Sequence, residues 1–247
     1  MLQERAAARW QAGQVGRGAD TVAVEAVCEL FIDAALVSRT VVSPSLLAEW
    51  GAGHAICEGW IEAADITSVA ARDGRVLLTS RAGVRSASRL VQQTSGYLGR
   101  EGAALPQPVS SDIRIAPESI EAWAAALSER ATGWRQTGGL HVALLCEPEG
   151  RILALAEDVG RHNALDKVVG HAHLAGLDRS RCVVVVSGRM PQGMVVKAAR
   201  AGIPVVVTKA ASTDLGIDCA NALNLTLICF ARSNRFTVYS GEERVLL

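Results

Sequence analysis

The sequence lacks an excess of either charge and has no long apolar run, and both absences exclude classes of protein. Lys and Arg together number 25, as do Asp and Glu, so the formal net charge is zero. General binders of nucleic acid or acidic membranes usually carry a basic excess. No apolar run reaches the roughly 18–20 residues that span a bilayer. No apolar block follows the Arg residues of Met1–Trp10, so we expect no signal peptide and a cytoplasmic location.

The six cysteines lack the spacing of a metal or redox motif. No two of them form a C-x-x-C pair, which argues against zinc-ribbon and thioredoxin-type proteins. Cys28, Cys146, Cys182 and Cys229 lie in or beside apolar, strand-like runs. Free cysteine is among the most frequently buried residue types, so we expect reduced thiols in the core.

Several common catalytic motifs are also absent. The sequence contains no G-x-x-x-x-G-K-[ST] phosphate loop, no G-x-S-x-G nucleophile elbow and no Rossmann glycine fingerprint. No His has neighbours at metal-ligand spacing, so we expect no metal site.

The length and residue pattern predict two domains after a short tail. Residues 1–20 are rich in Arg, Gly, Ala and Gln without periodicity, which indicates a flexible tail. Residues 21–113 mix strand-like and helical patterns and predict a smaller α+β domain, with a loop-like stretch at 90–104. Residues 114–247 alternate strands and helices, which is typical of a three-layer α/β domain.

The expected elements follow from apolar periodicity and from turn residues. In the first domain, Ser43–Ser45 should cap a helix that runs to Cys57, and Arg72–Gly74 should close a hairpin. In the second, 140–146 and 152–156 should pair around Glu147–Gly150. Apolar strands are expected at 182–186, 203–207 and 225–230, and helices at 117–127, 162–175, 194–201 and 213–224.

Three of these strands are followed by loops with a common composition. Ligands of open parallel sheets bind outside the carboxyl ends of the strands. Each loop combines a cation, a small residue and a hydroxyl or amide side chain, which suits a phosphorylated ligand. Phe230 could lie against a flat heterocycle. The candidate binding residues in these loops are Ser187, Gly188, Arg189, Lys209, Thr213, Phe230, Ala231, Arg232, Ser233, Asn234 and Arg235.

The segment Asp158–Lys167 adds a fourth group at the start of an expected helix. A helix start presents unpaired N–H groups and a positive dipole end, which suit an anion. Arg161 is therefore a candidate ligand residue. His162 could contact the ligand or hold the helix start, and His141 could face the same cleft or serve the fold; both alternatives stay open.

These residues resemble the FdhD family of formate dehydrogenase accessory proteins. The resemblance extends from about Glu25 to Tyr239 and is densest in the second half. The matching segments are Asp158–Lys167, Ser187–Arg189, Met194–Pro204, Thr213–Ile217, Phe230–Arg232, Val238–Tyr239 and, in the first half, Ala55–Ile61.

The resemblance implies a fold and a cargo. It implies a cytidine-deaminase-like C-terminal domain that binds the molybdenum cofactor as bis-molybdopterin guanine dinucleotide, with Phe230–Arg235 in the binding region. It also implies a homodimer that serves the catalytic subunit of formate dehydrogenase. In the family, a loop cysteine accepts sulfur from a cysteine desulfurase and passes it to the cofactor.

The chain departs from the family at that loop. Ser95 and Leu98 stand where the family has its two cysteines, and neither side chain offers a thiolate for sulfur transfer. No catalytic residue is therefore assigned. The zinc deaminase signature is missing too, because His162-Asn163-Ala164 lacks the Glu and Pro191–Val195 lacks both Cys.

Two functions from different classes remain. The chain could be a non-catalytic carrier, in effect a chaperone, that holds the cofactor and delivers it to the dehydrogenase. Alternatively, it could be a sulfurtransferase that uses another of its cysteines. A nucleotide-binding scaffold with no role for molybdenum is a third alternative. The missing loop chemistry and the persisting pocket motifs favour the carrier, so enzymatic activity is not expected.

Overall fold

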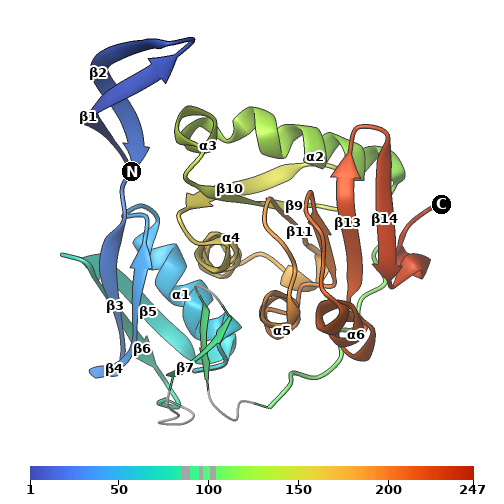
Figure 1. Ribbon diagram of the computed structural model, residues 1–247. Helices are drawn as coiled ribbons and strands as arrows, with labels where there is room; N and C mark the ends of the chain where they lie inside the picture. Colours follow the sequence, from blue (N-terminus) through green and yellow to red (C-terminus); the bar gives the residue numbers. More distant parts are fainter. Residues whose placement is uncertain (85–89, 95–96, 101–103) are drawn as a thin grey trace.

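Two sheets divide the chain into a smaller N-terminal part and a larger C-terminal part (Figure 1). The computed structural model describes residues 1–84, 90–94, 97–100 and 104–247. The strands are β1 (Leu2–Gln11), β2 (Gln14–Ala23), β3 (Ala26–Ile32), β4 (Ala35–Val42), β5 (Ile66–Arg72), β6 (Arg75–Ser80), β7 (Leu90–Thr94), β8 (Tyr97–Arg100), β9 (His141–Cys146), β10 (Ile152–Asp158), β11 (Val183–Val186), β12 (Val205–Thr208), β13 (Thr226–Arg232) and β14 (Arg235–Ser240). The α-helices are α1 (Leu47–Cys57), α2 (Pro117–Arg130), α3 (Thr132–Thr137), α4 (Arg161–Leu174), α5 (Gln192–Arg200) and α6 (Asp214–Ala222).

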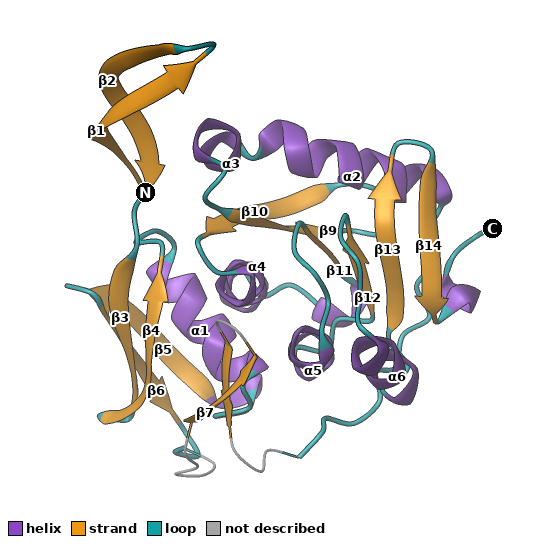
Figure 2. Cartoon of the chain, in the orientation of Figure 1, coloured by secondary structure: helices purple, strands orange, loops and turns teal. Residues whose placement is uncertain are grey.

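The larger part is a three-layer α/β domain, as the sequence predicts. Its sheet has the order β10-β9-β11-β12-β13-β14, with β11, β12 and β13 parallel. The valines of β11 and β12 are buried on both faces, as expected for central parallel strands. Helices α4, α5 and α6 cover one face and α2 the other (Figure 2). No helix in the described ranges is both long and apolar enough to cross a membrane.

The smaller part is the predicted α+β domain. Its sheet has the order β4-β3-β6-β5, and α1 packs against it. Cys28, Leu30 and Ile32 of β3 alternate with less buried positions and form the core with Trp50 of α1. This alternation leaves one face of the sheet for α1 and the other for solvent.

The first 20 residues correct a sequence prediction. Instead of a flexible tail, β1 and β2 pair as an antiparallel hairpin that projects from the molecule (Figure 1). Ala12 and Gly13 both have positive φ, which fits the two-residue turn that matches strand twist. The signal was hard to recognise because Ala rarely occupies such a turn position.

A second hairpin occupies part of the stretch expected to be a loop. Strands β7 and β8 pair antiparallel between 90 and 100. The glycines of this stretch suggested a loop, whereas its Val, Thr and Tyr residues favour strands. The position of Ser95 lies outside the described residues, and Leu98 lies in β8.

The two domains meet where α1 crosses α4 with no side chain between the backbones. A Cβ atom added to Gly53 would lie 1.8 Å from the carbonyl oxygen of Asp166. A Cβ added to Gly170 would lie 1.8 Å from the carbonyl oxygen of Glu49. Each glycine therefore makes room for the opposite helix, and no other residue fits at either position.

Ser43 differs from its predicted role as a helix cap. The N-cap position of α1 is Leu46, and no side chain caps the helix. Ser43 instead bonds to the second domain: its N–H donates to Asp158 Oδ2 at 3.0 Å, and its Oγ accepts from the Val159 N–H at 3.1 Å. Ser43 therefore bonds to residues of the second domain and does not cap the helix that follows it. A pattern of neighbouring residues cannot predict such a long-range partner.

Gly53→Ala should destabilise the protein strongly, because the new methyl group would press against the α4 backbone. We expect the free energy of unfolding to fall by about 3 kcal/mol or more. Urea denaturation followed by circular dichroism measures this change. Gly18→Ala is the matched control, since its Cβ would meet nothing within 4 Å. Equal stability of the two variants would contradict the close crossing.

Candidate functional site

A cleft of about 570 Å³ opens at the edge of the large sheet where β11, β12 and β13 end. Ser187, Lys209 and Arg232, one from each predicted strand-end loop, line it. The opposite wall comes from α2, from α3 and from the turn that leads into β9. The sequence prediction that the three strand ends face a common cavity is thus consistent with the geometry, and the volume lies within the range of small-ligand pockets.

Buried hydrogen bonds hold the first two loops together. The Ser187 Oγ accepts from the Val142 N–H at 2.9 Å, and the Ser187 N–H donates to the Val142 carbonyl at 3.0 Å. The Thr208 hydroxyl donates to the Gly188 carbonyl at 2.7 Å and accepts from the Ala210 N–H at 3.0 Å. These hydrogen bonds pair polar groups of the loop backbone within the protein. The loops that carry the charged side chains are therefore held in one conformation.

Two cations at the strand ends, Lys209 and Arg232, are anchored by neutral groups. Lys209 Nζ donates to Ser128 Oγ at 2.6 Å and to the Ala124 carbonyl at 3.3 Å, both on α2. Arg232 Nη1 donates to the carbonyl oxygens of Lys209 and Ala231 at 2.7 and 2.8 Å. Burial and the charge of Arg232 both lower the pKa of Lys209. Their positive charges are therefore positioned but not neutralised.

Arg161 and Arg189 form a second pair of cations beside the cleft, although neither of them belongs to its lining. Arg161 is the first residue of α4, and its side chain packs over Gly188, where an added Cβ would lie 3.0 Å from the Arg161 Cβ. Burial and the neighbouring charge of Arg189 lower the pKa of Arg161. The buried Arg161 Nε has no hydrogen-bond partner in the part of the chain that the structure describes.

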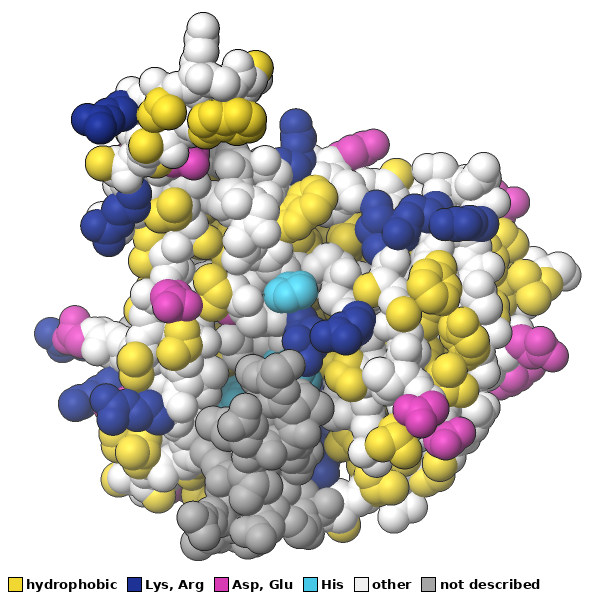
Figure 3. Space-filling view, viewed as in Figure 1, with side chains coloured by type: hydrophobic (Ala, Val, Ile, Leu, Met, Phe, Trp, Pro, Cys, Tyr) yellow, Lys and Arg dark blue, Asp and Glu magenta, His cyan; other side chains and the backbone are white. Residues whose placement is uncertain are grey.

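These four cations share a further property. Within the described ranges, no carboxylate forms an ion pair with Arg161, Arg189, Lys209 or Arg232. Figure 3 shows Lys and Arg side chains gathered on this face around a histidine. Repelling cations that lie together without acidic partners are typical of a site for a multiply charged anion.

His141 belongs to this region, whereas His162 does not line the cleft. His141 lies at the start of β9, with its Nδ1 3.4 Å from Ser187 Oγ. Burial and the charge of Arg161 lower the pKa of His141, so the ring is neutral. His162 is buried on α4, where burial, Lys197 and Arg161 lower its pKa to about 2.

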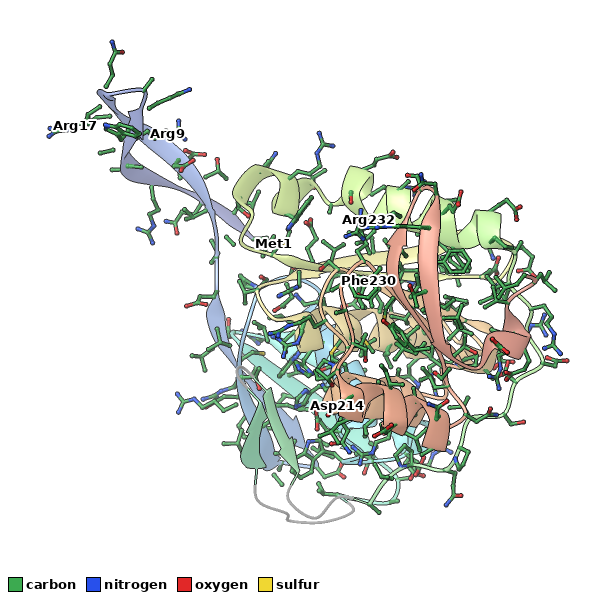
Figure 4. The ribbon with its side chains drawn as sticks, turned by 45° about the vertical axis from the view of Figure 1, so that its right-hand side comes forward. Met1, Arg9, Arg17, Asp214, Phe230 and Arg232 are labelled. Atoms are coloured by element: carbon green, nitrogen blue, oxygen red, sulfur yellow. The ribbon has the colours of Figure 1, made fainter. Side chains whose placement is uncertain are left out.

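Several predicted binding residues lie outside the cleft lining. Thr213 caps α6 by accepting from the Gly216 N–H at 3.2 Å, and Ala231 is buried. Phe230 is 37% exposed and has a positive φ of 55°. Figure 4 shows Phe230 and Arg232 on β13, with Arg9 and Arg17 at the remote end of the N-terminal hairpin. The remaining residues of this group, Ser233, Asn234 and Arg235, make the β13–β14 turn and the start of β14.

Trp134 of α3 lines the cleft, as do Gly138 and Gly139, and sequence reasoning missed all three. Helix α3 spans only six residues, which is too short for a periodic signal. The sequence feature that could have indicated them is a Trp shortly before the Gly138-Gly139 pair.

A carboxylate of the chain itself, that of Asp158, lies beside the start of α4. Asp158 Oδ1 accepts from the Gly160 N–H at 2.8 Å and from Asn163 Nδ2 at 2.9 Å. Asp158 Oδ2 forms a fully buried ion pair with Lys167 at 2.6 Å. Lys167 also donates to the Ser43 carbonyl at 3.1 Å. Asp158, Asn163 and Lys167 of this motif thus join the two domains, whereas Val159 lines the cleft and Arg161 packs against Gly188 beside it.

A second buried ionic cluster lies deeper in the same interface. Lys197 of α5 pairs with Asp166 at 2.6 Å and with Glu58 at 2.8 Å, and His54 Nδ1 lies 3.0 Å from Asp166. Burial raises the pKa of Asp166, but Lys197 and His54 outweigh it and hold the pKa at about 2. The carboxylate therefore stays ionised, and its contribution to stability is lost only as the pH falls from about 4 toward 2. The described residues contain no cluster of three or more His, Cys, Asp or Glu that could hold a metal ion.

All six cysteines are buried and free, as the sequence predicts. Burial raises the pKa of Cys28 and Cys182 to about 11 and that of Cys229 to about 12. It also raises the pKa of Cys57, Cys146 and Cys219. Thiols of this kind are protonated at neutral pH and are poor nucleophiles.

Comparisons with known proteins agree on one family. Residues 23–246 match the model of the FdhD/NarQ family. A sulfur carrier protein FdhD from Methanothermobacter thermautotrophicus is 34% identical over 87% of this chain and 87% of its own length. The one from Shouchella clausii is 33% identical over 97% and 95%. A crystal structure of a putative formate dehydrogenase accessory protein from Desulfotalea psychrophila superposes with a TM-score of 0.81 at 26% identity, covering 100% of this chain and 99% of that one.

Native protein should not react with thiol reagents. At about pH 8, a thiol with a pKa near 11 is ionised to about one part in a thousand, and burial blocks access as well. We expect no rapid modification by Ellman's reagent before denaturation and six thiols per chain after it. Rapid labelling of any one thiol in the folded protein would contradict this.

Lys167→Met should leave the Asp158 carboxylate buried without its cation. We expect a loss of about 3–5 kcal/mol in the free energy of unfolding, measured by urea denaturation. Arg9→Ala removes an exposed ion pair with Asp20 and should have little effect. A Lys167→Met variant as stable as wild type would show that this pair does not join the domains.

Proposed function

The chain belongs to the FdhD/NarQ family, and we propose that it is a cofactor carrier without persulfide chemistry of its own. Its cargo is the molybdenum cofactor in the bis-molybdopterin guanine dinucleotide form. The carrier holds this cargo at the strand-end cleft and delivers it to the catalytic subunit of formate dehydrogenase in the cytoplasm. As in the family resemblance, the working form is a homodimer.

The observation that carries this proposal is a set of four cations in and beside the cleft, none of which pairs with a carboxylate of the described residues. A guanine dinucleotide presents a pyrophosphate, and guanidinium groups bind phosphate oxygens through paired donors. Arg161 and Arg189 suit the phosphates best, because neither donates to an anchoring group in any described contact. Lys209 and Arg232 supply fixed positive charge in the cleft itself, at the ends of β12 and β13.

The absence of persulfide chemistry rests on the cysteines. Sulfur transfer needs an accessible thiolate that attacks sulfur. The chain has Ser95 and Leu98 at the family positions, and its six thiols are buried with raised pKa values. The cargo would therefore have to receive sulfur elsewhere, before or after this protein holds it.

A sulfurtransferase remains the second candidate. It is favoured by the relatives, which bear the name sulfur carrier protein. In that case a cysteine desulfurase would be a partner, and one of the buried cysteines would have to become exposed to accept sulfur. Cys57 and Cys146 are both completely buried, so this route requires substantial opening of the protein.

Calorimetry with guanine and adenine nucleotides tests the carrier proposal. We expect GDP to bind, and Arg161→Ala or Arg189→Ala to weaken binding about ten- to a hundredfold, because charge-assisted bonds contribute roughly 1.5–3 kcal/mol each. Arg151→Ala, which removes a cation paired with Glu147 outside the cleft, is the control and should bind as wild type does. Absence of heat with every guanine nucleotide and with the intact cofactor would refute the proposal.

Sulfur labelling separates the two candidate functions. After incubation with a cysteine desulfurase and labelled cysteine, peptide mapping should find no persulfide on the wild-type chain. The variant Ser95→Cys with Leu98→Cys restores the family residues and should gain label. Label that passes from Cys57 or Cys146 to the cofactor would instead establish the sulfurtransferase.

A further inference from the structure

The cleft has two chemically different ends. Lys209, Arg232 and His141 line the side formed by the strands, whereas Leu127, Trp134 and Leu140 line the wall made by α2, α3 and the turn into β9. A nucleotide has the same polarity, with anionic phosphates at one end and a flat, largely apolar base at the other. A nucleotide bound with its phosphates toward the cations therefore places its base toward the apolar wall.

Trp134 is unusual among the tryptophans of this chain. Trp50, Trp60 and Trp123 are buried in the cores, whereas Trp134 is 40% exposed and faces the cleft. Trp10, 72% exposed, is the other accessible one and belongs to the N-terminal hairpin. An exposed indole beside a basic cleft is costly in water and gains most when a flat ligand covers it.

The backbone of Trp134 is held in place by a buried carboxylate. Glu157, at 5% exposure, accepts the N–H groups of Gly133 and Trp134 at 3.1 and 2.6 Å. Gly133 allows this approach, since a Cβ there would lie 2.8 Å from Leu140 and 3.1 Å from the carboxylate. Glu157 comes from β10, so the sheet itself fixes the height of α3 above the cleft.

We propose that the Trp134 indole is the stacking platform for the base of the bound nucleotide. This inference rests on the proposed function, because it assigns the base end of the same ligand. It places the heterocycle on α3, whereas sequence reasoning placed it against Phe230, which does not line the cleft. The phosphates then extend toward Arg161 and Arg189.

The platform supplies affinity but does not choose between bases. Stacking on an aromatic ring tolerates any base, because every base has a π-face. Discrimination between guanine and adenine must come from polar groups at the edge of the base. Removal of the Trp134 side chain therefore weakens the binding of GDP and of ADP by the same factor.

Calorimetry of Trp134→Ala with GDP, ADP and pyrophosphate tests the inference. Loss of stacking should weaken GDP binding about ten- to a hundredfold. Pyrophosphate binding should be unchanged, and the ratio of the GDP affinity to the ADP affinity should stay as in wild type. Trp134→Phe should recover most of the loss, and Trp10→Ala, the matched removal of an exposed indole away from the cleft, should have no effect.

The outcomes separate this inference from the proposed function. Tight GDP binding by wild type and by Trp134→Ala alike would overturn the inference alone. Loss of pyrophosphate binding together with GDP would also overturn it, because Trp134 would then only maintain the cleft. Failure of wild type to bind GDP would overturn the proposed function and the platform with it.

Discussion

The crossing of α1 over α4 at Gly53 and Gly170 is the contact on which the arrangement of the two domains depends. Because the helix backbones touch, the polar groups at the start of α4 come within reach of the N-terminal domain. Asp158 and Lys167 then bond to Ser43, and Asp166 bonds to His54. Two buried ion clusters are therefore tolerated in an interface, where each charge has a fixed partner. Arg161, on the same helix, takes no part in these bonds and packs against Gly188 beside the cleft.

The charge distribution follows from this division of roles. The acidic residues of the α4 motif form ion pairs inside the domain interface. The cations at the strand ends form no ion pair with a carboxylate of the described residues. A chain with zero net charge thus carries a locally basic cleft. A local concentration of positive charge attracts an anion to one site without causing non-specific binding of anions over the whole surface. This pattern suits a carrier of a phosphorylated cargo better than a general binder of polyanions.

Sequence reasoning recovered the features that depend on short-range pattern. The valine runs of β11 and β12, the common composition of their following loops and the buried cysteines were all predicted, as was the three-layer class. It could not recover features that depend on tertiary partners. Ser43 is a residue type that often caps helices but here bonds to the other domain, and within the predicted ligand segment Asp158 and Lys167 pair with each other. The position of Trp134 in the cleft was not predicted, because a helix of six residues is too short to show a hydrophobic period.

The most direct test is to identify the molecule that the protein carries. Native mass spectrometry of protein purified from cells that make the molybdenum cofactor would show the bound species without adding a ligand. The account predicts a guanine dinucleotide form of the cofactor, retained by wild type and lost from the Arg161→Ala, Arg189→Ala double variant, with no extra sulfur mass on the polypeptide. A persulfide on a cysteine of an otherwise ligand-free chain, or a cargo retained equally by the double variant, would contradict it.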